Sequence, residues 1–423
     1  MKMVKGFESM LAGSLDLDEP WYITGAEFNP VKNVIDVHVG IREDAVIACP
    51  HCGGPTKRYG YEPTERSWRH ADCLFYPCYV HCKRPRVKCD NCGIQQVTAP
   101  FERQNSRHTL LFEGYAMMIM ADVPRRKASR LLRCNEKTLA SILSYWVNQA
   151  VEALDLSDVT KLAIDETSRK RGHDYVTVTI DAMKRRVFDV QDGRKKEAVA
   201  AMRKKLERHG GKASNITAVT SDMSKSYLPG VRENFPDAEQ IIDKFHVKKV
   251  LTDALDKVRK QEQKETNNKK DLFLNRHFLM TPQSRMNSEQ LTRLAALSKA
   301  YPKTGRAFRI VQALDLFYAS KDDKEAAKQF KQLYSWMRRS RLTPMKEAAE
   351  TLMNHEREIL HYFHERLTNA VCEGINSMIQ AAKRKARGYN TFEGFAAMIY
   401  LVAGKLELPV PDPFQITFPL IRE

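Results

Sequence analysis

Residues 161–191 read KLAIDETSRKRGHDYVTVTIDAMKRRVFDVQ and contain successive apolar runs bounded by polar residues. Runs of this length and composition predict β-strands. We expect the strands at Lys161–Asp165, Tyr175–Asp181 and Arg186–Gln191, the last two joined by a tight turn at 183–185. A helix should follow over residues 195–208, because Gly210 and Gly211 end it. The segment therefore predicts successive strands that lead into a helix.

Strands and helices continue to alternate beyond this segment. We expect strands at Ile216–Ser221 and Ala238–Ile242, and helices near Ser224–Asn234 and from Phe245 to about Gln263. The resulting order, β-β-β-α-β-α-β-α, is the RNase H-like arrangement. In that fold the first and fourth strands lie side by side, so residues at the ends of these strands become neighbours.

Three carboxylates far apart in the sequence are candidates for one metal site. Asp165 ends the first strand, Asp222 ends the fourth, and Glu373 sits near the start of the helical stretch 369–376. Two aspartates at strand ends and a glutamate on a helix can hold two Mg²⁺ ions, and such a pair drives phosphodiester cleavage and transfer. We therefore expect these residues to be both metal ligands and catalytic residues.

Other carboxylates compete with these three. Asp243 ends the fifth strand and is the main alternative to Asp222, which we prefer because its strand should pair with that of Asp165. Glu166 follows Asp165 and should point to the opposite face of the sheet. Asp181 and Asp192 lie where a strand meets a turn. We expect both to cap these turns, as aspartate commonly does.

The helix that carries Glu373 should begin with a cap at Thr368 or Asn369 and end at Gly388. One polar face of this helix holds Glu373, Asn376, Ser377 and Gln380. The cations that follow are expected to bind DNA phosphate: Lys383, Arg384, Lys385 and Arg387. Taken alone, the stretch is also compatible with a solvated amphipathic helix; behind two strand-end aspartates, a metal ligand with a phosphate clamp is favoured.

Seven of the nine cysteines fall between residues 49 and 92. The pairs Cys49-Pro-His-Cys52 and Cys89-Asp-Asn-Cys92 are each followed by glycine, which permits a tight turn. Two such pairs predict a closed, structural Zn²⁺ site with a β excursion over residues 54–88 between them, against the alternative of free thiols. The extra residues Cys73, Cys78 and Cys82, near His51, His70 and His81, could form a second metal site. We favour the interpretation that they are buried thiols or an alternative ligand set.

Helical periodicity begins after Pro100, with Leu110, Leu111, Tyr115, Met118 and Ile119 on one face of a helix that ends before Pro124. Residues 124–133 and 136–146 then predict two helices joined by a short break at Cys134-Asn135. This pattern suits either a helix-turn-helix or a simple helical hairpin. In a helix-turn-helix, the second helix enters the major groove of DNA with Lys137, Thr138 and Ser141 near the base edges.

Composition limits the class of protein. The 423 residues carry a net charge of +17, which points to a polyanion partner such as DNA. No apolar run approaches the ~20 residues of a membrane span, and the start of the chain lacks the apolar core of a signal peptide. We therefore expect a cytoplasmic protein, bound to the nucleoid when it holds DNA, in which cysteines bind metal or stay reduced.

The expected fold class is multidomain α+β. An N-terminal region with a zinc-binding β domain should span residues 1–100, and a helix-turn-helix domain residues 101–156. An RNase H-like α/β catalytic domain should occupy 157–263 and 367–410. Residues 264–366 are helical and charged, with apolar spacing at Phe308, Val311, Leu314, Phe317, Phe330, Leu333 and Trp336, and predict an all-α insertion.

The chain resembles the transposases of the ISL3 family of bacterial insertion sequences over most of its length. The segments that carry the resemblance are 49–52 with 89–92, Ile164-Asp-Glu-Thr-Ser168, Ser221-Asp-Met-Ser224, Ile242-Asp-Lys-Phe-His-Val247, 368–376 and 383–389. The resemblance implies a zinc-binding domain, a helix-turn-helix and a DDE catalytic domain of RNase H-like fold. It places the catalytic triad on Asp165, Asp222 and Glu373, in agreement with the choice made from the residues.

The sequence thus predicts a DNA transposase that acts on the terminal inverted repeats of its own element. Its cofactors should be two Mg²⁺ or Mn²⁺ ions per active site and structural Zn²⁺, and it should work as a homodimer or higher oligomer on paired DNA ends. One alternative is a catalytically inactive sequence-specific DNA-binding protein. Another is an RNase H-like nuclease or resolvase that cuts without joining.

Overall fold

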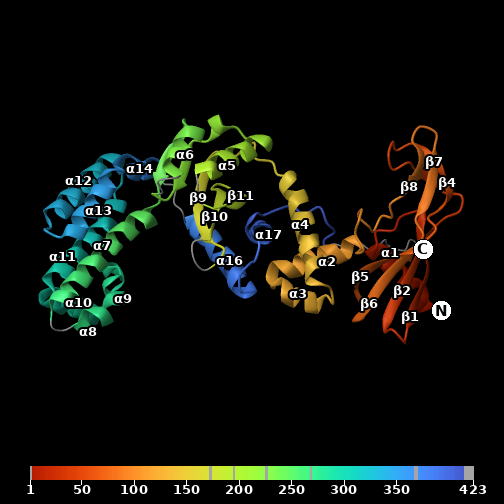
Figure 1. The fold of residues 1–423 in the computed structure, drawn as a ribbon, viewed down its shortest axis with the longest axis horizontal. Helices are drawn as coiled ribbons and strands as arrows, with labels where there is room; N and C mark the ends of the chain where they lie inside the picture. The colour runs from red at the N-terminus through yellow and green to blue at the C-terminus, as the bar shows by residue number, and fades with distance from the viewer. Residues whose placement is uncertain are drawn as a thin grey trace. The chain divides into compact units, whose positions relative to one another are not determined.

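The computed structural model describes residues 2–170, 174–193, 196–223, 227–266, 269–365 and 370–413 (Figure 1). The chain forms two compact units. Unit 1 runs to Val151 and takes in the chain again from Leu406, and unit 2 comprises Glu152–Lys405. This division is coarser than the four domains expected, and their boundaries stay a prediction. Within the described residues, no helix combines the length and the apolar character that crossing a membrane requires.

Unit 1 begins with helix α1 (Lys2–Ser14) and two β-sheets. One sheet has the order β1-β2-β6-β5, from β1 (Trp21–Asn29), β2 (Val34–Ile41), β6 (Tyr76–Cys82) and β5 (Arg66–Cys73). The other has the order β3-β4-β7-β8, from β3 (Val46–Ala48), β4 (Pro55–Tyr61), β7 (Pro85–Cys89) and β8 (Gly93–Gln96). The expected β excursion over residues 54–88 is confirmed. Its middle, the antiparallel pair β5–β6, belongs to the first sheet, where β6 runs parallel to β2.

Three helices complete the described part of unit 1: α2 (Leu110–Asp122), α3 (Arg125–Leu131) and α4 (Glu136–Glu152). Helix α2 ends before Pro124 as expected, but the face chosen from periodicity was not its most buried one. The most buried positions include Phe112, Ala116, Met117 and Met120, whereas Tyr115, Met118 and Ile119 are only half-buried. The helix is apolar on nearly all sides and contacts both β5 and α3, so apolar spacing alone could not select the core face.

Unit 2 holds one five-stranded sheet of order β11-β10-β9-β12-β13. Its strands are β9 (Lys161–Ser168), β10 (Tyr175–Asp181), β11 (Arg186–Asp192), β12 (Ala218–Ser221) and β13 (Glu239–Ile242). Strand β10 is antiparallel to both neighbours, and β9, β12 and β13 are mutually parallel. The expectation that the first and fourth strands of this sheet lie side by side is confirmed by the pairing of β9 with β12.

The two faces of this sheet carry different helices. Leu162 and Ile164 of β9 share a core with residues of α5 (Lys196–Arg208) and α6 (Tyr227–Asn234). On the other face, β9 contacts α16 (Ala370–Ala386), which is followed by α17 (Phe392–Ala403). Side chains of a strand alternate between faces, so the odd-numbered residues of β9, including Asp165, lie on the α16 side.

Between β13 and α16 the chain is helical throughout its described residues. Helix α7 (Lys244–Glu265) leads into α8 (Lys269–Leu274), α9 (Arg276–Leu279), α10 (Ser288–Ala300), α11 (Pro302–Tyr318), α12 (Asp323–Arg339), α13 (Thr343–Met353), α14 (Glu356–Leu360) and α15 (Tyr362–Glu365). Helices α11 and α13 pack on α7. The expected core positions of α11 and α12 are buried except Trp336, which is 39% exposed; the neighbouring Met337 takes the buried place.

Candidate metal centres

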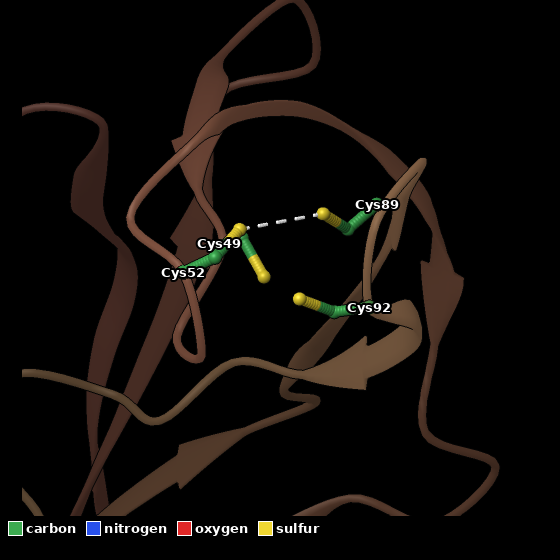
Figure 2. A group of neighbouring side chains, drawn as sticks. All are labelled: Cys49, Cys52, Cys89 and Cys92. Atoms are coloured by element: carbon green, nitrogen blue, oxygen red, sulfur yellow. Dashed lines mark hydrogen bonds between the residues drawn. The ribbon is translucent and has the colours of Figure 1, made fainter.

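The four cysteines with two-residue spacing come together at one end of the β3-β4-β7-β8 sheet (Figure 2). Cys49 and Cys52 lie between β3 and β4, and Cys89 and Cys92 lie at the turn from β7 to β8. Their sulfur atoms all lie within 4.8 Å of one another. The glycines behind the two pairs, Gly53 and Gly93, both have φ of +72°, a left-handed conformation that glycine adopts without strain.

The geometry fits a structural Zn²⁺ ion. A tetrahedral Zn–S length near 2.3 Å places neighbouring sulfurs about 3.8 Å apart, and the Cys52 and Cys89 sulfurs lie 3.6 Å apart. Backbone N–H groups of Cys52 and His51 lower the pKa of the Cys49 thiol to about 7. Hydrogen bonding to the Cys52 thiol and burial raise the pKa of Cys92 to about 12. A cation among the four sulfurs would stabilise all of them as thiolates, and Zn²⁺ is the ion that closed four-cysteine sites hold.

The three additional cysteines do not extend this centre. Cys78 and Cys82 lie in the core of the β1-β2-β6-β5 sheet, where burial raises the pKa of each thiol to about 12. Cys73 is half-buried and packs against the same core. Across the described residues, only one group of three or more histidine, cysteine, aspartate or glutamate side chains is gathered closely enough to share an ion. It consists of Cys49, Cys52, Cys89 and Cys92. The favoured interpretation as buried thiols is confirmed for Cys78 and Cys82, whereas Cys73 is only half-buried.

The acidic residues of unit 2 gather at one edge of its sheet. The register pairs Ala218 with Lys161 and Thr220 with Ala163, so Asp222, just past β12, is level with Asp165. The register of β13 pairs Ile242 with Ser221, and the Asp243 backbone N–H donates to the Ser221 carbonyl at 3.1 Å. Asp165, Asp222 and Asp243 therefore lie level with one another on three neighbouring parallel strands. Asp222 and Asp243 directly follow their strands, but the expectation that Asp165 ends its strand was wrong, because pairing with β10 continues β9 to Ser168.

Asp165 has both carboxylate oxygens engaged. The backbone N–H of Glu166 donates to Oδ1 at 2.7 Å, and the Asn376 amide of α16 donates to Oδ2 at 2.6 Å. Burial raises the pKa of Asp165, and the charges of Asp222 and Asp243 add to this rise. Glu166 interacts instead with Tyr227 of α6, so the expected opposite orientation of these two consecutive residues is confirmed.

Helix α16 runs along β9 through a row of polar contacts. Below Asn376, the Gln380 amide donates to Thr167 Oγ1 at 2.6 Å, and Lys383 Nζ donates to Ser168 Oγ at 2.8 Å. Burial lowers the pKa of Lys383. The expected end of the helix at Gly388 is confirmed by its φ of +98° and by its N–H bond to the Lys383 carbonyl. The expected caps, Thr368 and Asn369, lie outside the described residues.

Glu373 lies on the first turn of α16, one turn before Asn376, and is exposed. Among the described residues, Asp165 and Asp222 are not gathered closely enough with either Glu373 or Asp243 for three carboxylates to share an ion as they stand. The charges of Asp165, Asp243 and Glu373, after burial, raise the pKa of the buried Cys372 thiol beside it. Glu373 and the aspartates of the sheet edge therefore act electrostatically on the same residue, Cys372.

Sequence reasoning missed His246. It lies on the first turn of α7, with Nδ1 3.4 Å from the Asp243 carboxylate. Burial would lower the pKa of His246, but the contact with Asp243 and the charges of Asp222 and Asp165 prevail and raise it. The available signal was the i, i+3 spacing of Asp243 and His246 at the start of a helix, which puts both on one face.

The residues expected to face DNA from unit 1 lie at the start of α4. Lys137 and Ser141 are exposed and Thr138 is half-buried, while Leu139 of the same turn is fully buried. Asn135 Oδ1 accepts the Lys137 N–H at 2.8 Å and so caps the helix. Of the cations at the end of α16, Arg384, Lys385 and Arg387 are exposed.

Comparison with known proteins gives matches to both parts of the chain. A family model described as a transposase, of the ISL3 type, matches residues 162–399, and one described as a zinc-finger of transposase IS204/IS1001/IS1096/IS1165 matches residues 45–92. The transposase for insertion sequence element IS1557 of Mycobacterium tuberculosis is 24% identical over 84% of this chain and 85% of its own. The transposase for IS1001 of Bordetella parapertussis is 25% identical over 83% of this chain and 87% of its own.

Proposed function

The chain belongs to the ISL3 family of transposases, and we propose that it cleaves and joins DNA strands at the ends of its own insertion sequence. The observation that carries the proposal is the level row formed by Asp165 of β9, which contacts α16, and by the aspartates that directly follow β12 and β13. Such a row offers the concentration of oxygen ligands that phosphodiester chemistry with divalent ions requires.

We assign catalysis to Asp165, Asp222 and Glu373. The sheet order β11-β10-β9-β12-β13 supports an RNase H-like catalytic domain. In it, β10 is antiparallel to both of its neighbours, and β9, β12 and β13 are parallel to one another. All three candidate ligands are carboxylates, which suit Mg²⁺ or Mn²⁺. Burial and neighbouring carboxylates disfavour the charged form of Asp165, and a divalent cation would relieve that repulsion.

When bound, two divalent ions would supply activation of the attacking oxygen and stabilisation of the leaving oxygen. The protein groups prepare this site. Asn376 and the Glu166 N–H fix both oxygens of Asp165, so that this ligand is oriented before DNA arrives. Glu373 stands one helical turn from Asn376 on α16 and would complete the ligand set, while Arg384 and Arg387 would hold the DNA backbone.

Recognition of the DNA ends is assigned to unit 1. Helices α3 and α4 with the short break between them support a helix-turn-helix, with Lys137, Thr138 and Ser141 directed to base edges of the terminal inverted repeats. The zinc-braced sheet would stabilise this unit on DNA, and the net charge of +17 supplies backbone affinity. Two paired ends would require a homodimer or higher oligomer.

A strand-transfer assay tests the proposal. Purified protein is mixed with Mg²⁺ or Mn²⁺, labelled DNA carrying the ends that flank the gene, and a target plasmid. Wild type should nick at the ends and join them to the plasmid, whereas Asp222→Asn and Glu373→Gln should bind the ends without nicking. Asp192→Asn, at an exposed aspartate that ends β11, is the matched control and should keep activity.

Each other outcome favours a different function. Tight binding without nicking by wild type, in metal and with paired ends, would indicate a DNA-binding protein that has lost catalysis. Nicking without joining would indicate a nuclease or resolvase. Nicking that survives in Asp222→Asn would remove that residue from the catalytic set.

A further inference from the structure

Asp243 is the third aspartate of the level row, and the proposed ligand set leaves it without a role. It is 5% exposed and lies one strand beyond Asp222. It lies between β13 and α7, the helix on which α11 packs, and its charge also acts on Asp165 and on Cys372 of α16. Burying a carboxylate at such a junction is costly unless a partner compensates it.

The position of Asp243 in the chain makes its orientation informative. It occupies the N-cap of α7, a helix of 22 residues, where an aspartate side chain usually accepts backbone N–H groups of the first turn. The Asp243 side chain makes no such cap bond. Its Oδ2 lies 3.4 Å from Nδ1 of the His246 ring, within ion-pair range, and this buried Nδ1 makes no hydrogen bond within the described part of the chain. The usual N-cap hydrogen bond is therefore absent, and the Asp243 carboxylate lies beside His246 instead. Departures of this kind from local preference are typical of functional sites.

His246 connects this pair with the proposed metal ligands. Its ring is 25% exposed and lies within electrostatic reach of Asp165, Asp222 and Asp243. A ring held by one carboxylate and facing two others has the arrangement by which outer residues orient metal ligands.

We propose that Asp243 and His246 are positioning residues of the acidic edge: Asp243 holds the His246 ring, and the ring holds Asp165 and Asp222 in place for the divalent ions. This inference rests on the proposed function, since it assigns the pair to the same site. It also separates Asp243 from Asp222, because the first acts through His246 and the second binds the ion itself.

The test measures how much metal each variant needs. Asp243→Asn and His246→Ala should raise the Mg²⁺ concentration for half-maximal end cleavage by about 10–100-fold and still cleave when Mg²⁺ is saturating. Asp222→Asn should stay inactive at every concentration. His246→Gln, which keeps a side-chain N–H, should recover part of the loss. The urea unfolding transition of unit 2 should remain cooperative in all of these variants, which would show that the unit carrying the substitutions is folded.

A second readout does not depend on activity. Mn²⁺ titrated into the full chain bound to end DNA and followed by electron paramagnetic resonance should bind wild type more tightly than Asp243→Asn, by about 10–100-fold. Equal Mn²⁺ affinity and equal Mg²⁺ dependence would overturn the inference and leave the pair a purely structural contact. Complete inactivity of Asp243→Asn at saturating metal would also overturn it, by making Asp243 a direct ligand. If wild type bound Mn²⁺ but never cleaved, the proposed function would fail while the pair could still be tested.

Discussion

The two candidate metal centres of this protein are built in opposite ways. In unit 1, each half of the cysteine centre lies within one four-residue turn, and the sulfurs are already within 4.8 Å of one another. In unit 2, the acidic edge draws Asp165, Asp222 and Asp243 from three strands and Glu373 from a helix that follows the all-α segment. The first centre is closed and suits a structural ion, whereas the described carboxylates of the second are not gathered closely enough to share an ion as they stand.

The difference teaches how each centre depends on its surroundings. A two-residue spacing with glycine behind it fixes the geometry of a cysteine pair locally, so only the meeting of two turns remains to be arranged. The acidic edge depends on strand register and on the placement of α16, and a shift of one residue would turn a carboxylate to the other face. Changes that separate local from long-range construction therefore test the comparison.

The largest effect is expected from loss of zinc. Structural zinc sites contribute about 10 kcal/mol of binding free energy at neutral pH, so Cys52→Ser should unfold the β3-β4-β7-β8 sheet. Metal analysis should find zinc lost, and limited proteolysis should cleave unit 1 but not unit 2. Cys78→Ala is the matched control: it should retain one zinc and cost about 1–2 kcal/mol of stability through a small cavity. Zinc retained by Cys52→Ser would contradict the assigned ligand set.

A smaller free-energy change with a large kinetic result is expected at the acidic edge. Asp165→Asn should reduce end cleavage roughly a thousandfold or more, which is about 4 kcal/mol of transition-state stabilisation. Zinc content and binding of the DNA ends should not change, because unit 1 is untouched. The measurement is single-turnover cleavage at saturating metal. A loss of less than about tenfold would show that Asp165 is not a metal ligand.

Next in size is the amide that orients Asp165. Asn376→Ala removes the 2.6 Å hydrogen bond to Asp165 Oδ2. The loss of a hydrogen bond to a charged group is worth about 1.5–3 kcal/mol, so cleavage should slow by roughly 10–150-fold. Ser377→Ala, at the neighbouring exposed position of α16, serves as the control and should be neutral. Equal rates for the two variants would mean that the contact does not prepare the site.

The smallest effect is expected at the turn between β10 and β11. Asp181 Oδ1 accepts the N–H groups of Met183 and Lys184, both at 3.1 Å, and its other oxygen lies 3.3 Å from Arg186 Nε. Asp181→Ala should lower the free energy of unfolding of unit 2 by about 1–3 kcal/mol, as read from urea unfolding, without changing zinc content. Asp181→Asn keeps an acceptor and should cost less; an unchanged midpoint in both would deny the turn-capping role.

Much of the fold follows from local patterns. Short apolar runs predicted all five strands of the unit 2 sheet, with each strand boundary correct to within three residues. Such runs arise because a strand buried on both faces carries apolar or small side chains on both sides. The face of α2 and the position of Trp336 were wrong for a related reason. Helix α2 is apolar on nearly all sides, so its apolar spacing does not select one buried face. Trp336 lies in the last turn of α12, where too few residues remain for periodicity to select the buried one.

The sequence by itself determined the cysteine centre, the order of strands and helices, and the strand ends before Asp222 and Asp243, whereas β9 continues past Asp165 to Ser168. These depend on spacing along the chain, which short-range geometry converts directly into structure. Only the tertiary structure decided that the three aspartates are level, that Asn376 binds Asp165 and that Asp243 turns to His246 instead of capping α7. Asp165 and Asn376 lie far apart in the chain, so strand register and helix packing bring them together. Asp243 has two competing local partners, the backbone of α7 and the His246 ring, and the surrounding packing decides between them.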